Sequence, residues 1–103
     1  MSQNPIRAAL AERGCAVGPW LSVADPAVVS ALGTAGCDFV LADGQHGPHD
    51  LSNLMPLGAA AKAAQIALMV RVPWSEPWMV MRALDFGAAA VLVPMVSTVE
   101  QAT

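Results

Sequence analysis

The segment DPAVVSALGTAGCDFVLA, residues 25–42, predicts a helix followed at once by a buried strand. Asp25 can cap the helix and Pro26 suits its first position, while Gly36 fits the position just after its end. The apolar run 37–42 shows no polar alternation, which is typical of a strand covered on both faces in a parallel sheet. A unit of this kind indicates a parallel α/β fold.

The same alternation of strand and helix continues in both directions from this segment. The region after Asp50 allows two interpretations: a helix from Asp50 that Pro56 would kink or break, or a short turn followed by a helix over 56–64. The remaining expected elements are strands over 15–23, 37–42, 66–72 and 89–94 and helices over 26–36 and 77–86.

An internal echo fits this alternation. Pro26 and Pro77 lie 51 residues apart, and the same offset relates Gly36 to Gly87. A repeat of about two βα pairs is how a parallel barrel or a doubly wound sheet is built. The match is short, so duplication and chance similarity between βα units both remain open.

The last residues of the chain predict a further helix. Ser97 with Glu100, and Thr98 with Gln101, have the spacing of capping boxes. Because the chain ends at Thr103, it would contain only the first turn of that helix. We therefore expect a truncated fold, a partial (β/α)8 TIM barrel with about the first four βα units of an architecture that typically needs about 250 residues.

The composition agrees with an incomplete surface. The 103 residues suit one domain, with 55% hydrophobic and only 13% charged residues, where a soluble domain typically has about 25% charged. We expect a partner or further chain to cover part of this surface. The net charge of −3 and the scattered Lys and Arg residues exclude nucleic-acid binding driven by phosphate neutralisation.

The sequence also argues against a membrane protein. The longest uncharged run, between Asp85 and Glu100, is too short to cross a bilayer. Arg7 stands where a signal peptide would need an apolar stretch. Cys15 and Cys37 suit reduced thiols better than a disulfide framework. We therefore expect a cytoplasmic protein.

Candidate functional residues gather at the predicted carboxyl ends of the strands, where parallel β/α folds bind ligands. A histidine can move a proton near neutral pH, and an arginine can hold a carboxylate or enolate oxygen. Together they suit chemistry on a small anionic substrate. The candidates are Asp43, Gln45, His46 and His49 after the second strand, Arg71 at the end of the third, Ser97 and Thr98 after the fourth, and Ser22 and Asp25 near the first.

Structural interpretations stand beside the functional ones. His46, between two glycines, can equally be an ordinary loop residue, and Arg71 must bind either a structural carboxylate or a ligand. We expect His49 to be a solvated loop residue. Asp43, His46 and His49 would be a weak metal set, because three residues on one short loop have no further His or Cys to support them.

Six motifs carry a resemblance to a known family. In order and spacing the chain resembles the HpcH/HpaI aldolases, such as 4-hydroxy-2-oxoheptanedioate and 2-dehydro-3-deoxyglucarate aldolases. The resemblance implies a (β/α)8 barrel of which residues 1–103 are the N-terminal half. The motifs are GPWL (18–21), AGCDFVL (35–41), DGQHGP (43–48), VRV (70–72), ALDFGA (83–88) and VLVPMV (91–96).

The resemblance also implies a chemistry, a class II retro-aldol cleavage of a 4-hydroxy-2-oxo acid to pyruvate and an aldehyde. His46 matches the family's base, Arg71 its transition-state stabiliser and Asp85 the carboxylate that raises the basicity of the histidine. The family's divalent metal (Mg, Mn or Co) is held by a Glu and an Asp on later strands, which this chain lacks. Gln45 stands where the family usually has Glu. Trp20, Asp43 and Gln45 are the expected substrate-binding residues.

Asp85 presents a geometric problem. It precedes Gly87 at the end of a predicted helix and therefore belongs at the opposite face of the barrel from His46. A neighbouring subunit of a homo-oligomer could supply it; alternatively, Asp85 only pairs with Arg82 on its own helix. Two other functions remain open: a non-catalytic half-barrel that assembles with itself or with a separate C-terminal half, and a citrate-lyase-like carbon–carbon lyase.

Overall fold

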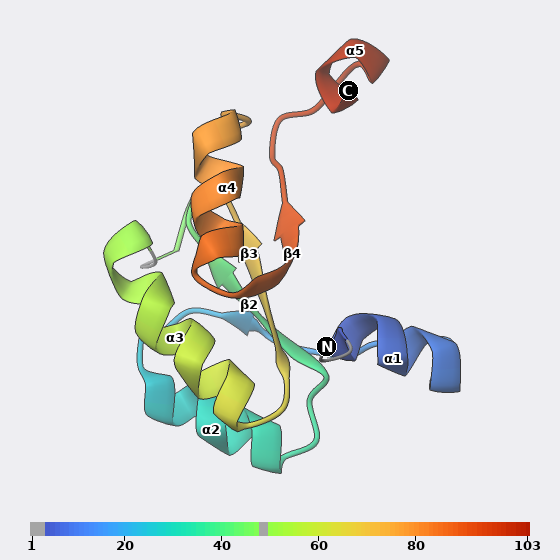
Figure 1. The fold of residues 1–103 in the computed structure, drawn as a ribbon, viewed down its shortest axis with the longest axis vertical. Helices are drawn as coiled ribbons and strands as arrows, with labels where there is room; N and C mark the ends of the chain where they lie inside the picture. Colours follow the sequence, from blue (N-terminus) through green and yellow to red (C-terminus); the bar gives the residue numbers. More distant parts are fainter. Residues whose placement is uncertain (1–3, 48–49) are drawn as a thin grey trace.

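Four parallel strands lie side by side in the order in which they occur in the sequence (Figure 1). The computed structural model describes residues 4–47 and 50–103. A sequential order is that of a barrel wall, whereas a doubly wound sheet reverses direction at a switch point, so the partial barrel is confirmed. The elements are α1 (Pro5–Arg13), β1 (Trp20–Leu21), α2 (Pro26–Thr34), β2 (Phe39–Asp43), α3 (Leu51–Ala63), β3 (Ala67–Arg71), α4 (Pro77–Asp85), β4 (Ala88–Leu92) and α5 (Val99–Ala102).

The core lies between one face of the sheet and helices α2, α3 and α4. Side chains alternate along each strand, so Val40 and Val70 enter this core while Leu41 and Asp43 point to the other face. The register places Leu41 beside Met69 and Asp43 beside Arg71. The largest fully buried side chains all belong to this core: Leu57, Leu68, Val29, Val40, Val70 and Val72.

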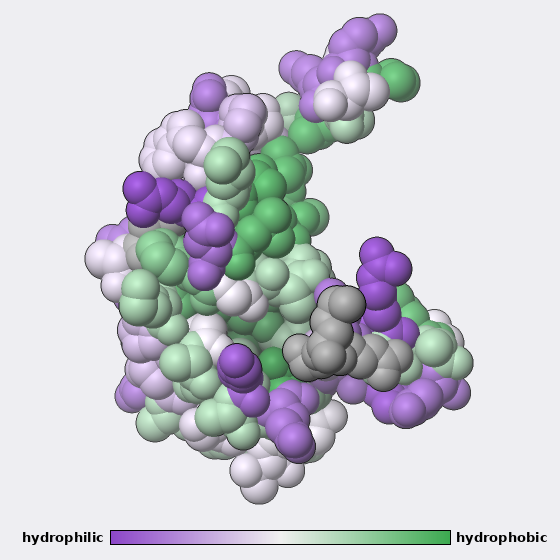
Figure 2. Space-filling model, viewed as in Figure 1, coloured by the Kyte–Doolittle hydropathy of each residue, from purple (hydrophilic) through white to green (hydrophobic). Residues whose placement is uncertain are grey.

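The other face, which would line the interior of a barrel, is apolar and partly open. Leu92 is 39% exposed at the end of β4, and Met95 is 62% exposed just beyond it. Figure 2 shows hydrophobic surface beside α4, along β4 and the segment that follows it. No strand among residues 4–47 and 50–103 pairs with the outer edge of β4. Both features fit a barrel wall that has not closed.

Helix α1, which the sequence analysis did not foresee, tethers the amino terminus to the sheet. The Asn4 side-chain oxygen accepts hydrogen bonds from the backbone N–H groups of Ile6 and Arg7 and so caps the helix. Its Nδ2 donates to the carbonyl of Ala89, 2.9 Å away on β4. In Figure 1, α1 lies apart from α2, α3 and α4.

The first strand is much shorter than the predicted 15–23. Only Trp20 and Leu21 are regular strand. The carbonyls of Val17 and Pro19 still accept backbone hydrogen bonds from Asp38 and Leu41 around β2. Pro19 has no N–H to donate in return, so the ladder cannot extend evenly in this direction.

Of the two interpretations after Asp50, the continuous helix is observed. α3 runs through Pro56 without a break, and Asp50 and Asn53 form a capping box at its start. The short α5 begins at a second capping box, between Thr98 and Gln101. The other predicted elements occur with ends shifted by a few residues. No helix in the described part of the chain is long and apolar enough to span a bilayer.

Candidate active site

A partly buried ion pair joins the carboxyl ends of β2 and β3. Asp43 is the last residue of β2, is only 4% exposed, and lies beside Arg71 in the register of the sheet. Arg71 Nε donates to Asp43 Oδ1 at 2.9 Å and Nη2 donates to Oδ2 at 2.6 Å. This two-pronged geometry is the strong form of the Arg–carboxylate interaction. The expected carboxylate partner of Arg71 is therefore Asp43.

Three further donors complete the surroundings of the Asp43 carboxylate. Trp20 Nε1 donates to Oδ2 at 3.1 Å, and the backbone N–H groups of Gln45 and His46 donate to Oδ1 at 2.9 and 3.1 Å. The Trp20 ring also lies under the Arg71 guanidinium, with 4.8 Å between Cζ and the ring centroid. The structure thus unites Trp20, Asp43 and Arg71 from three strands.

This environment keeps both partners charged. The hydrogen bonds from Arg71 hold the pKa of Asp43 well below its usual range, helped by the backbone N–H groups of His46 and Gln45, although burial acts in the opposite direction. Asp43 in turn raises the pKa of Arg71. The pair is therefore ionised across the physiological range.

Arg71 retains donors for a ligand. A guanidinium has five N–H groups, and Asp43 takes one from Nε and one from Nη2. The other three, two on Nη1 and one on Nη2, have no acceptor among the residues that the structure describes. With its side chain 20% exposed, Arg71 can still present a charged edge to an anionic oxygen at the carboxyl end of the sheet, which we call the rim.

His46 lies in the turn directly after β2. Its imidazole is exposed and makes no hydrogen bond within the described ranges, while its backbone is fixed by Asp43. The tight turn also depends on Gly47, because a Cβ there would come within 2.6 Å of the Asp43 carbonyl oxygen. The backbone of His46 is therefore fixed at the rim next to Asp43, while its imidazole has no hydrogen-bond partner among the described residues. His49 lies outside the described residues.

Asp85 lies far from this rim within the chain. It ends α4, three residues before β4 begins, at the amino end of the sheet. Its side chain is exposed, and no ion pair joins it to Arg82 in the described structure. The Arg82 alternative is therefore not observed, and within one chain Asp85 cannot orient His46.

The described residues do not fit a metal site. No group of three or more His, Cys, Asp or Glu side chains within 4–47 and 50–103 could hold an ion. The carboxylate at the rim, Asp43, is already committed to Arg71 and Trp20.

Asp43 and Arg71 lie at the strand ends where the sequence predicted them, but the sequence did not reveal how they connect. Asp43 and Arg71 each end one of two consecutive strands, and this signal could have predicted their pairing. Nothing comparable indicated that the Trp20 indole would reach both of them from β1.

Comparisons with known proteins place this arrangement in context. The chain is 41% identical over 99 residues to the 5-keto-4-deoxy-D-glucarate aldolase of Salmonella paratyphi A; the match covers 96% of this chain and 39% of that protein. It superposes on an HpcH/HpaI aldolase from Desulfitobacterium hafniense DCB-2 with a TM-score of 0.86 at 28% identity, covering 94% of this chain and 38% of the other. An HpcH/HpaI aldolase/citrate lyase family protein from Burkholderia cenocepacia J2315 gives 0.83 at 33% identity, covering 97% and 40%.

The chain thus spans about two fifths of the length of these relatives. The family model HpcH/HpaI aldolase/citrate lyase matches residues 16–103, which include every rim residue described above. This chain belongs to the HpcH/HpaI aldolase/citrate lyase family.

Proposed function

We propose that the chain supplies the base and the enolate-binding arginine of an aldolase that cleaves a 4-hydroxy-2-oxo acid to pyruvate and an aldehyde. The single observation that carries this proposal is the ionised Arg71, fixed by Asp43 at the rim with three N–H groups still available. Family membership supports the reaction class, and the aldolase relative from Salmonella supports a keto-acid substrate.

In the proposed reaction His46 accepts the proton of the C4 hydroxyl. The electron pair of that O–H bond forms the aldehyde carbonyl as the C3–C4 bond breaks. The pair from the broken bond forms a C2=C3 double bond, and the π pair of the C2 carbonyl moves onto its oxygen, giving the pyruvate enolate. Arg71 donates to the oxygen on which negative charge develops, where a preorganised donor is most effective. Return of the proton to C3 then releases pyruvate.

We also propose that the complete enzyme depends on a divalent ion (Mg, Mn or Co), as the family resemblance implies. The described residues of this chain offer no cluster that fits such an ion, so its ligands would have to include residues other than these. Trp20, Asp43 and Gln45 would line the substrate pocket beside Arg71.

A chimera tests the function. This chain replaces the matching segment of the Salmonella aldolase, and pyruvate release from 5-keto-4-deoxy-D-glucarate is measured with added Mn²⁺ or Mg²⁺. We expect activity in the chimera and a loss on the order of 100-fold or more for His46→Ala, the usual contribution of a general base. Arg71→Lys keeps the positive charge but lacks the planar guanidinium, and it should also lose pyruvate release. A folded but inactive chimera beside an active parent would refute the proposal.

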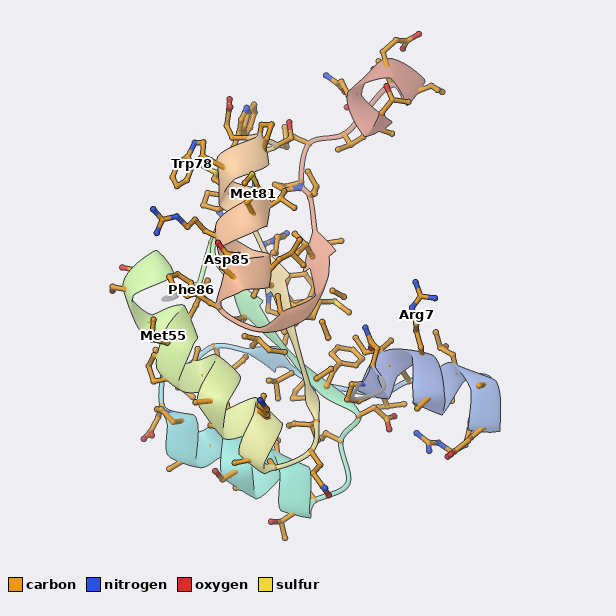
Figure 3. The ribbon with its side chains drawn as sticks, viewed as in Figure 1. Arg7, Met55, Trp78, Met81, Asp85 and Phe86 are labelled. Carbon is orange, nitrogen blue, oxygen red and sulfur yellow. The ribbon has the colours of Figure 1, made fainter. Side chains whose placement is uncertain are left out.

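We further propose that Asp85 acts on His46 of a neighbouring subunit in a homo-oligomer. Asp85 is exposed on α4 among large apolar side chains that are also exposed: Trp78 at 51%, Met81 at 62% and Leu84 at 52%. Figure 3 shows Met81 and Asp85 on the outward side of the helix. An exposed apolar surface of this kind is typical of a protein interface.

Subunit mixing tests the shared site. Chimeras with Asp85→Asn and with His46→Ala are each expected to be nearly inactive. Mixed oligomers should regain part of the activity, because some sites then combine an intact His46 with an intact Asp85. The control puts Asp85→Asn subunits through the same mixing procedure with further copies of the same variant, in which no site regains an intact Asp85. Absence of rescue in verified mixed oligomers would show that Asp85 has no role across the interface.

A second candidate function, a half-barrel that assembles without catalysis, is favoured by the open apolar face along β4, with Leu92 39% exposed. Size-exclusion chromatography combined with the pyruvate assay separates it from the aldolase. A stable assembly of the 103-residue chain, found together with a chimera that releases no pyruvate, would support the second function.

A further inference from the structure

Trp20 makes two contacts of different kind with the residues that the proposed function assigns to catalysis. Its indole N–H donates to Asp43 Oδ2 at 3.1 Å, and its ring faces the Arg71 guanidinium at 4.8 Å from Cζ. One contact is directional, and the other is a cation–π attraction to the ring face. A side chain that merely lined a pocket would need neither.

The topology explains how one residue reaches both. Trp20 on β1 lies beside Leu41 of β2 in the register, and Asp43 follows two residues later on the same face of β2. Asp43 lies beside Arg71 on β3. The indole therefore extends diagonally across β2 toward β3, within the reach of a large aromatic side chain.

Arg71 needs this support because Asp43 alone fixes only one edge of its guanidinium. The two hydrogen bonds from Nε and Nη2 leave the group able to rock about the line that joins them to the carboxylate. A ring stacked on the guanidinium face opposes that rocking. It does so without using any of the three N–H groups left for an anionic oxygen.

We propose that Trp20 is a positioning residue, which holds the plane of Arg71 and the Asp43 carboxylate so that the Nη1 edge of Arg71 faces the carboxylate or enolate oxygen of a 2-oxo acid. This assignment rests on the proposed function for its ligand, but the positioning itself is a property of this chain. It differs from the expectation that Trp20 simply binds substrate.

The first test uses the 103-residue chain and does not depend on activity. The Arg71 Nε–H signal is followed by ¹H–¹⁵N NMR, together with its exchange with water. In Trp20→Leu we expect the signal to lose its ring-current shift and to exchange on the order of 10-fold faster, as for a hydrogen bond weakened by about 1.4 kcal/mol. Trp20→Phe keeps a ring without an N–H and should retain most of the shift.

Trp74→Leu is the matched control, since Trp74 is 49% exposed and Trp20 is 53% exposed, and no hydrogen bond or cation–π contact joins Trp74 to Arg71 among the described residues. It should leave the Arg71 signal unchanged. An unchanged Arg71 signal in a folded Trp20→Leu chain would overturn the positioning role, whatever the chimera does.

The second test asks whether positioning matters for the proposed reaction. In the chimera, Trp20→Leu should lower kcat on the order of 10- to 100-fold, the effect of a misplaced catalytic group, with KM nearly unchanged. Trp20→Phe should recover part of kcat. A rise in KM with kcat intact would instead show that Trp20 is a substrate platform. If the chimera were inactive but the Arg71 Nε–H signal still changed in Trp20→Leu as expected, the proposed function would be refuted and the positioning role would stand.

Discussion

Asp43 is a buried charge whose stability depends on the donors around it. Five hydrogen bonds reach its two oxygens, and Arg71 is the main reason that its pKa lies below the usual range. Because the folded pKa is depressed, the pair stabilises the fold fully above the unfolded pKa of about 3.9. The contribution is lost as the pH falls from there through the folded pKa.

Asp43→Asn should therefore be less stable than the parent at pH 7, with a difference that shrinks between about pH 4 and pH 2. Urea unfolding followed by circular dichroism at several pH values measures this. Asp38→Asn is the comparison, because Asp38 also has a lowered pKa, from the Val17 N–H and from Arg13, but its side chain is 18% exposed where that of Asp43 is 6% exposed. If both variants lost the same amount of stability, burial of the Asp43 pair would not matter.

Gly18 is required by a close backbone approach. A Cβ at this position would lie 2.1 Å from the carbonyl oxygen of Phe39 on β2. Gly18→Ala must push the segment before β1 away from β2, and we expect a loss of about 2–3 kcal/mol in the free energy of unfolding. Gly14→Ala is the control: it has open space but a φ of +76°, and should cost about 1 kcal/mol. Equal losses in thermal unfolding would contradict the close-approach argument.

At the level of single residues, the sequence revealed which residues lie at the rim but not the contacts between them. His46 and Arg71 could be placed because parallel strands end at one edge of a sheet. The Trp20 contacts could not, because they depend on the reach of one side chain across β2, which no spacing rule describes. A contact between Asp85 and a second subunit likewise cannot be predicted from the spacing of residues within one chain.

Among the elements, α3 contains a proline that should destabilise it. Pro56 is exposed in the sixth position of the helix, where it removes the hydrogen bond that the Ser52 carbonyl would accept. We expect Pro56→Ala to stabilise the chain by about 1 kcal/mol, less than the full propensity difference because the unfolded chain gains entropy. Pro26→Ala, at a first helical position, should be neutral or slightly destabilising. Thermal unfolding of both variants decides; a destabilised Pro56→Ala would mean that the proline has a role in packing.

Helix α1 depends on the two functions of Asn4. Asn4→Asp keeps an oxygen that can cap the helix but has no N–H to donate to Ala89, whereas Asn4→Ala loses both. We expect Asn4→Ala to cost about 1 kcal/mol and Asn4→Asp to cost less. Hydrogen exchange of the α1 amides should show the same ranking. Equal protection in all three chains would show that the tether is unimportant.

The helices also show which local sequence signals predict a helix start. Asn4-Pro5 has the same cap-and-proline signal as Asp25-Pro26, so α1 could have been predicted from residues already in hand. The length of β1 could not, because Pro19 and Gly18 only reveal their effect once β2 lies beside them. Local propensity thus identified where helices begin, while tertiary contacts set the strand ends.

For the whole molecule, the decisive feature is that two apolar surfaces remain uncovered on opposite sides of the sheet. One is the inner barrel face near Leu92, and the other is the outward side of α4 around Met81 and Leu84. Eight strands close such a barrel, and residues 4–47 and 50–103 of this chain provide four. Low charge, noted first in the composition, follows from this geometry, since interior and interface surfaces do not need charged residues.

The isolated chain should consequently self-associate through both surfaces. Light scattering after size-exclusion chromatography is expected to show a mass that rises with concentration. Leu92→Lys on one surface and Met81→Lys with Leu84→Lys on the other should each lower that mass, and the combination should give a monomer, because a buried lysine opposes association at either contact. Ala31→Lys, on the exposed side of α2, adds the same charge away from both surfaces and should change nothing. If only the α4 variant mattered, the open barrel face would be inert in solution, and the surface beside α4 alone would account for assembly.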